Sequence, residues 1–139
     1  MREAFLQKLE KRVLVCDGAM GTMLYSKGIA FNRCFDELSL TMPQLVKEVH
    51  LGYVKAGADV IQTNTFGGNR PRLQKFELED RVREINLAAA RLAREVAGDD
   101  RYVAGSVGPL GTYLEPLGPT SLHSRSAVWE TLESRPELV

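Results

Sequence analysis

Three short apolar runs divide this chain, and each ends in a polar, glycine-rich segment. The runs occupy residues 12–16, 58–61 and 102–105, and the polar segments that follow them occupy residues 17–22, 62–69 and 106–111. Short apolar runs that are bounded by glycine-rich turns are typical of buried strands. We therefore predict three strands, each of which leads into a loop with polar side chains.

Apolar residues recur with a helical period between the first two runs. Thr41 precedes this stretch as a candidate N-cap with Gln44 in the capping-box position, and Gly57 ends it. The apolar stripe consists of Leu45, Val49, Tyr53 and Ala56. Residues 26–40, which come before this helix, show no period, and irregular stretches of that length are usually functional or mobile.

A clearer helical period lies between the second and third runs. Its apolar residues are Leu78, Val82, Ile85, Ala89, Leu92 and Val96, and Gly98 ends it. We also expect a short helix over residues 3–11, closing the lower end of the core with Phe5, Leu6 and Leu9, and another over about residues 124–132. Strands that alternate with helices predict an α/β fold with a parallel sheet. Ligands bind at the carboxyl ends of such strands, so we expect a small-molecule site there.

Composition narrows the kind of ligand. The 139 residues include 44% hydrophobic and 26% charged residues, which is the balance of one globular domain. Lys plus Arg equals Asp plus Glu at 18 each, so no net charge attracts nucleic acid or an anionic membrane. The N-terminus lacks the apolar core of a signal peptide, and no run approaches a membrane span, which predicts a cytoplasmic protein. Cys16 and Cys34 lie outside any CxxC pattern and predict neither a disulfide framework nor a zinc site.

Four ordered motifs resemble the opening motifs of the homocysteine S-methyltransferase family. They are residues 17–24 (DGAMGTML), 32–38 (NRCFDEL), 57–69 (GADVIQTNTFGGN) and 103–111 (VAGSVGPLG). The second of these motifs and residues 82–86 are most similar to the bacterial enzymes that join this domain to a methylenetetrahydrofolate reductase. The resemblance covers about residues 1–118, and the tail of residues 119–139 is atypical.

The resemblance implies a (β/α)8 barrel, of which this chain would form an N-terminal, truncated portion of about three βα units. It also implies methyl transfer to the thiol of homocysteine, giving methionine, with zinc held by three cysteines late in the barrel. Cys16 and Cys34 match positions in the first half, so no metal ligand is assigned to this chain, and we expect it to be inactive alone. The methyl donor, which in the family is a folate, a sulfonium or a betaine, is not identified by any residue.

Three residues are the candidate substrate contacts. The resemblance implies that Asp17 holds the amino group of homocysteine and that the backbone amides beside it, at Gly18, help to hold the carboxylate. A carboxylate is a charge-assisted acceptor for an ammonium, although aspartate and glycine also serve plain turns. Asn64 is a candidate pocket contact, with hydrogen bonding inside its own loop as the alternative.

Two other functions remain open at this stage. The chain could be a non-catalytic binding or assembly module that pairs with a C-terminal half or with itself, because exposed strand edges favour association. It could also be an unrelated α/β enzyme with another ligand.

Overall fold

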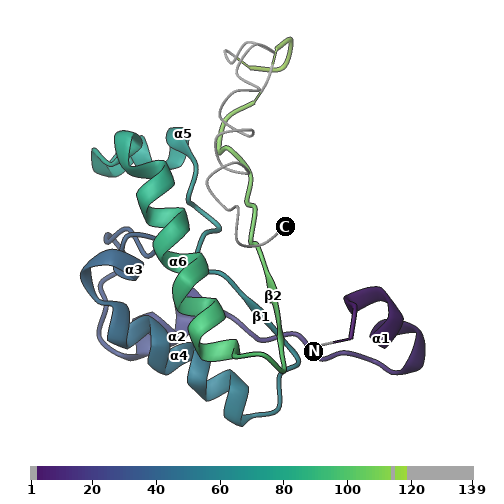
Figure 1. Cartoon of the computed structure of the whole chain (residues 1–139). Helices are drawn as coiled ribbons and strands as arrows, with labels where there is room; N and C mark the ends of the chain where they lie inside the picture. The colour runs from purple at the N-terminus through teal and green to yellow at the C-terminus, as the bar shows by residue number, and fades with distance from the viewer. Residues whose placement is uncertain (1–2, 114, 119–139) are drawn as a thin grey trace.

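The computed structural model describes residues 3–113 and 115–118 as a helical layer packed on a small parallel sheet (Figure 1). In chain order the elements are α1 (Phe5–Lys11), α2 (Met20–Ser26), α3 (Leu38–Thr41), α4 (Pro43–Lys55), β1 (Val60–Gln62), α5 (Arg70–Leu73), the 3₁₀ turns η1 (Gln74–Phe76) and η2 (Glu79–Arg81), α6 (Val82–Ala97) and β2 (Tyr102–Ala104). The expected helix over residues 124–132 and the tail of residues 119–139 lie outside the described residues. None of the described helices is long and apolar enough to cross a membrane.

The sheet confirms the predicted parallel arrangement. β1 and β2 pair in parallel, with Val60 opposite Tyr102 and Gln62 opposite Ala104, and α6 lies in the crossover between them. Tyr102 N–H donates to Asp59 O at 3.0 Å and Thr63 N–H donates to Ala104 O at 2.9 Å, which extends the pairing beyond both ends.

The predicted first strand over residues 12–16 is wrong as a continuous strand. Only Cys16 forms a bridge, to Val60, although this segment does run parallel to β1. The Asp59 side chain explains the difference, because its Oδ2 accepts the Val15 N–H at 3.0 Å and also pairs with the Arg12 guanidinium. A side chain therefore takes the place of a backbone ladder partner at the start of the segment.

Helix α4 begins one residue later than predicted, and Thr41 is not its N-cap. Met42 occupies the N-cap position, and Pro43 starts the helix, where the missing N–H of proline has no cost. The buried residues of α4 are Val46, Val49 and His50. Of the predicted stripe, Val49 is buried and Leu45 and Tyr53 pack against the core, whereas Ala56 is exposed. Gly57 follows the helix at φ 98°, as its predicted end requires.

Helix α6 provides the main packing surface of the sheet. The turn η2 precedes it, so the predicted start near Leu78 is too early, but Gly98 does cap it at φ 60°. Its buried residues are Val82, Ile85, Asn86, Ala89, Ala90, Leu92, Ala93 and Ala97. Small alanines on this face allow the helix to approach Ile61 of β1 closely, in a core cluster with Ala93 and Ala97.

The N-terminal helix α1 lies near the amino end of β2, apart from the other helices in Figure 1. Phe5 packs edge-on against Tyr102, with ring centroids 5.2 Å apart, and the Tyr102 hydroxyl donates to Glu3 O at 2.6 Å. The predicted helix is confirmed, but its apolar face does not close the core as predicted, because no residue of α1 is buried and Leu6 is 69% exposed.

Candidate functional site

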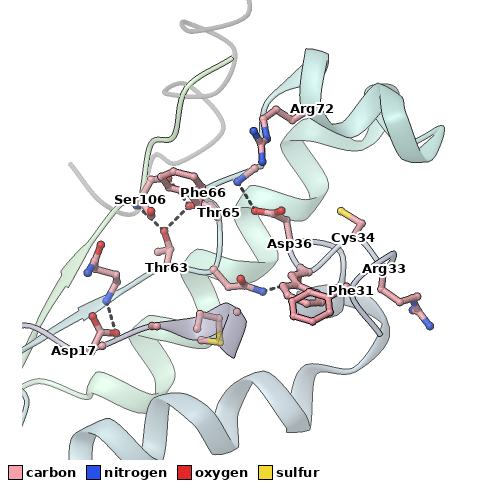
Figure 2. Close-up of a pocket in the computed structure, with 18 of the residues that line it drawn as sticks. Asp17, Phe31, Arg33, Cys34, Asp36, Thr63, Thr65, Phe66, Arg72 and Ser106 are labelled. Carbon is pink, nitrogen blue, oxygen red and sulfur yellow. Dashed lines mark hydrogen bonds between the residues drawn. The ribbon is translucent and has the colours of Figure 1, made fainter. Parts of the chain in front are cut away.

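A cavity of about 680 Å³ lies at the carboxyl ends of the strands, where the sequence predicts a site (Figure 2). Its walls come from residues 17–21, from the irregular stretch 31–36, from residues 62–67, and from Arg72, Phe76 and Ser106. Asp17, Gly18 and Asn64, the three predicted substrate contacts, all line this cavity. A cavity of this volume is comparable to those that hold drug-sized ligands, roughly 300–1,000 Å³.

Asp17 is fixed to strand β1 by both its backbone and its side chain. Its N–H donates to Val60 O at 2.9 Å, and its Oδ2 accepts the Gln62 N–H at 2.9 Å. Burial raises the pKa of this carboxyl group, whereas the Gln62 bond acts in the opposite direction. The second oxygen, Oδ1, contacts the Cys16 thiol at 3.6 Å. A carboxylate has lone pairs for several donors, so Asp17 can accept a further cationic donor.

Gly18 has a packing role that sequence reasoning did not identify. A Cβ at this position would lie 2.9 Å from the ring and hydroxyl of Tyr53 on α4. The Tyr53 hydroxyl donates to Ala19 O at 2.9 Å, which joins the helix to the loop after Asp17. Among the described residues, no acceptor contacts the N–H groups of Gly18 and Ala19, which lie at the cavity wall.

The polar residues at the ends of the strands form a closed hydrogen-bond group. The hydroxyls of Thr63 and Thr65 are 2.6 Å apart, and Thr65 Oγ1 donates to Ser106 O at 2.8 Å. Ser106 N–H in turn donates to Thr63 Oγ1 at 3.0 Å (Figure 2). These contacts lock the loop after β1 to the loop after β2, so both threonines support the wall of the cavity.

Asn64 uses its amide nitrogen within the protein. Nδ2 donates to Phe35 O at 2.7 Å and to Ser39 Oγ at 3.4 Å, and the residue is 7% exposed. Neither bond stays inside the loop of Asn64, because Phe35 and Ser39 lie 29 and 25 residues away, so the alternative of bonding inside its own loop does not describe these contacts. Asn64 holds the irregular stretch against the strand ends, and its role as a substrate contact stays a prediction.

Sequence reasoning missed a second contact that holds the irregular stretch against the strand ends, between Asp36 and Gly67. Asp36 Oδ1 accepts the Gly67 N–H at 2.8 Å, and a Cβ on Gly67 would meet Asp36 Oδ2 at 2.6 Å. The aspartate and the glycine both belong to quoted motifs, but nothing local in the sequence pairs them across 31 residues. Phe31, Arg33 and Arg72 were also missed as cavity residues. The unusual length of the irregular stretch was a signal for the first two, and Arg33 also belongs to the motif of residues 32–38.

The two cysteines and His50 lie in different environments and do not form a catalytic or metal-binding cluster within the described residues. Cys34 is buried at the cavity wall and Cys16 is exposed, and burial raises the pKa of both thiols. His50 is fully buried on α4, away from the cavity lining, and burial lowers its pKa to about 4. His123 lies outside the described residues.

The described residues do not fit a metal ion by themselves. Across residues 3–113 and 115–118, no group of three or more His, Cys, Asp or Glu side chains converges as a metal would require. We therefore derive no chemical step through a metal from this chain.

A sequence model described as "Homocysteine S-methyltransferase" matches residues 14–134, which is most of the chain. The chain belongs to the homocysteine S-methyltransferase family. Curated relatives include the methionine synthases of Mycobacterium tuberculosis and Mycobacterium leprae, which are 39% and 38% identical over 127 residues. These matches cover 83% of this chain but only 11% and 10% of the relatives, so the chain spans about a tenth of their length.

Solved structures of the family share the fold. The metallated form of the homocysteine methyltransferase MmuM from Escherichia coli matches with a TM-score of 0.72 and 25% identity, over 92% of this chain and 53% of that one. Its oxidized form matches with a TM-score of 0.71 and 26% identity, over 91% of this chain and 51% of that one. The chain thus resembles part of a homocysteine methyltransferase barrel and spans about half of its length.

Proposed function

We propose that this chain provides the homocysteine-binding part of a homocysteine S-methyltransferase, an enzyme that transfers a methyl group to the homocysteine thiol to give methionine. The observation that carries the proposal is the Asp17 carboxylate. It is anchored to β1 through Gln62, half-buried, and placed at the wall of the cavity in a chain of this family.

Asp17 accepts hydrogen bonds from the ammonium group of homocysteine in this proposal. The nearby N–H groups of Gly18 and Ala19 donate to the carboxylate of the same ligand, which satisfies both charged ends of the amino acid. A charge-assisted bond to a partly buried carboxylate is stronger than one in water because the local dielectric constant is lower.

The remaining half of the barrel would complete the site. We propose that residues 1–118 form about three βα units of the barrel, that the zinc ligands of the family lie elsewhere, and that this chain alone does not turn over. The length of the matched structures, about twice that of this chain, supports the proposal. Incubation of the chain with zinc, homocysteine and each methyl donor tests it, because methionine formed above the protein-free control would contradict it.

Calorimetric titration of homocysteine tests the role of Asp17. We expect Asp17→Asn to weaken binding by about ten-fold or more, since a charge-assisted bond contributes on the order of 1.5–3 kcal/mol. The fold should persist, because an asparagine oxygen can still accept the Gln62 N–H. Asp99→Asn, at an exposed position, removes the same charge and is the matched control. Equal dissociation constants of homocysteine for the two variants would mean that Asp17 only stabilises a turn and does not contact the substrate.

A non-catalytic assembly module is the second candidate. The segment before Asp17 leaves Val13 82% exposed and Val15 56% exposed beside an open sheet edge. Such edges template pairing with another chain. Size-exclusion chromatography with light scattering distinguishes the two candidates, because a monomer that melts cooperatively and binds homocysteine contradicts obligatory assembly.

A further inference from the structure

Asp17 and Gly18 form the only Asp–Gly pair in the sequence, and both line the cavity. In such a pair the backbone nitrogen that follows the aspartate is unshielded, because glycine has no side chain to cover it. That nitrogen can attack the carboxyl carbon of the aspartate and close a cyclic imide. A chemically labile pair therefore lies in the segment that holds the proposed ammonium contact.

Packing against Tyr53 requires the glycine at this position. A Cβ on Gly18 would lie 2.9 Å from Cε1 and from the hydroxyl oxygen of Tyr53, which is closer than real Cβ atoms approach another group. Tyr53 is fixed in turn, because its hydroxyl donates to Ala19 O at 2.9 Å and its ring packs against a buried core cluster. A larger residue that would shield the nitrogen is therefore excluded by the fold.

The Gly18 nitrogen is available for this attack. Within residues 3–113 and 115–118 its N–H donates to no acceptor, so no hydrogen bond within that part of the chain has to break before it reacts. The carboxyl group of Asp17 is half-buried, and burial raises its pKa. A larger share of this group is therefore protonated than of an exposed aspartate, and the protonated form is the one that loses water when an imide closes.

The hydrogen bonds of Asp17 favour one direction of the reaction. Its Oδ2 accepts the Gln62 N–H at 2.9 Å, whereas Oδ1 contacts the Cys16 thiol at 3.6 Å (Figure 2). A backbone N–H on Oδ2 stabilises the negative charge that develops on this oxygen when the nitrogen attacks, as the donors of an oxyanion hole do. Oδ1 is then the oxygen that leaves.

We propose that Asp17–Gly18 is a site of spontaneous modification, at which the aspartate converts to isoaspartate in the folded protein. The Gly18 nitrogen forms a bond to Asp17 Cγ and gives up its proton, and the Oδ1 hydroxyl leaves with that proton as water. A water molecule then reopens the imide. Attack at the former α-carbonyl carbon of Asp17 yields isoaspartate, and attack at Cγ restores aspartate, so no oxidant, reductant or other reactant is needed.

Isomerisation would alter the ligand site itself. The main chain then runs through the former side chain and is longer by one methylene group, and the carboxylate is attached directly to the α-carbon. The effect on homocysteine rests on the proposed function, since the modification displaces the carboxylate that would hold the ammonium group. Bound homocysteine would oppose the reaction, because its carboxylate accepts the Gly18 N–H and its ammonium group keeps Asp17 ionised.

Incubation of the folded chain at physiological temperature, followed by enzymatic methyl labelling of isoaspartate and peptide mapping, tests the proposal. The reference is the same chain unfolded in urea, because Gly18→Ala would block the reaction but would also strain the contact with Tyr53. We expect isoaspartate to form at Asp17 in the folded chain at a rate within about ten-fold of that in the unfolded chain. A slower rate would show that the fold protects Asp17 and would overturn the proposal.

Two controls show that the reaction belongs to this pair. Asp99 and Asp100 are exposed, but a residue with a side chain follows each of them, so both should react more slowly than Asp17. Asp17→Glu keeps a carboxylate on a longer side chain that closes an imide much less readily, and it should give no isomerised residue at this position. Isoaspartate that forms as fast at Asp99 as at Asp17 would also contradict the proposal.

Calorimetric titration with homocysteine during the incubation separates this inference from the proposed function. The number of homocysteine sites per chain should fall in step with the isoaspartate fraction. Homocysteine at about ten times its dissociation constant should slow the modification by about ten-fold, since only the free chain reacts. Isoaspartate that forms at the same rate with homocysteine bound, or without loss of sites, would support the modification and contradict the proposed function. The Asp17→Asn variant loses ammonia by the same attack, so its titrations require freshly purified protein.

Discussion

Truncation of Asn64 should destabilise the fold even without any ligand. Asn64→Ala removes the 2.7 Å bond to Phe35 O and the weaker 3.4 Å contact with Ser39 Oγ. A partly buried carbonyl left without its donor costs about 1–3 kcal/mol. The small void left by the missing amide adds about 1 kcal/mol. We therefore expect the free energy of unfolding to fall by about 2–4 kcal/mol, which for a chain of this size lowers Tm by roughly 8–16 °C.

Urea denaturation followed by circular dichroism measures this loss directly. Asn32→Ala makes the same chemical change at an exposed position of the same stretch and should stay within about 0.5 kcal/mol of the wild type. Ser39→Ala should lower stability less than Asn64→Ala, because it removes only the longer contact. Equal stabilities for the Asn64 and Asn32 variants would refute the view that Asn64 clamps the irregular stretch, and would restore the substrate contact as its main role.

Two further predictions concern the core. His50 is fully buried, and neither ring nitrogen has a hydrogen-bond partner in the described part of the chain. Its pKa of about 4 lies below the ordinary 6.5. Protonation therefore opposes folding, so stability should be complete above pH 6.5 and fall by up to about 3 kcal/mol as the pH drops toward 4. His50→Leu should remove this dependence in urea titrations at several pH values, and a wild type with flat stability over that range would contradict it. Gly68→Ala should cost about 1–3 kcal/mol, because the new Cβ would lie 2.7 Å from Asn86 Oδ1 in a fully buried contact. Gly52 lies on α4 with open space around it, so Gly52→Ala should instead raise the free energy of unfolding by about 0.5–1 kcal/mol. Thermal melts in which Gly68→Ala is more stable than Gly52→Ala would refute this account.

The sequence was most informative where burial follows a local period. The stripe of α6 and the apolar start of β1 could be predicted because each depends on residues a few positions apart. The first strand could not, since the Asp59 side chain intercepts the Val15 N–H from 44 residues away. The face of α4 was predicted only in part, because Val49 belongs to it but a histidine was not expected to be fully buried.

In the candidate site, too, the residues that depend on a local pattern could be predicted and those that depend on long-range contacts could not. Asp17 was found from the strand and loop that contain it, and the structure places it at the cavity. Asp36 and Arg72 reach the same cavity through contacts between distant loops, with Gly67 and beside Gly111. No local pattern signals such contacts, so these two residues of the cavity wall were identified only from the structure.

The hydrogen bond from the Tyr53 hydroxyl to Ala19 O joins the loop after Asp17 to the hydrophobic core. Tyr53 packs in the same cluster as Val46 and Val49, so the loop after Asp17 can move only as far as helix α4 allows. Substitutions in this part of the core would then change the rate and precision with which the loop captures a ligand, although Val46, Val49 and Tyr53 do not line the cavity. Directed evolution of affinity in this chain should accordingly select residues on α4 as well as residues at the cavity wall.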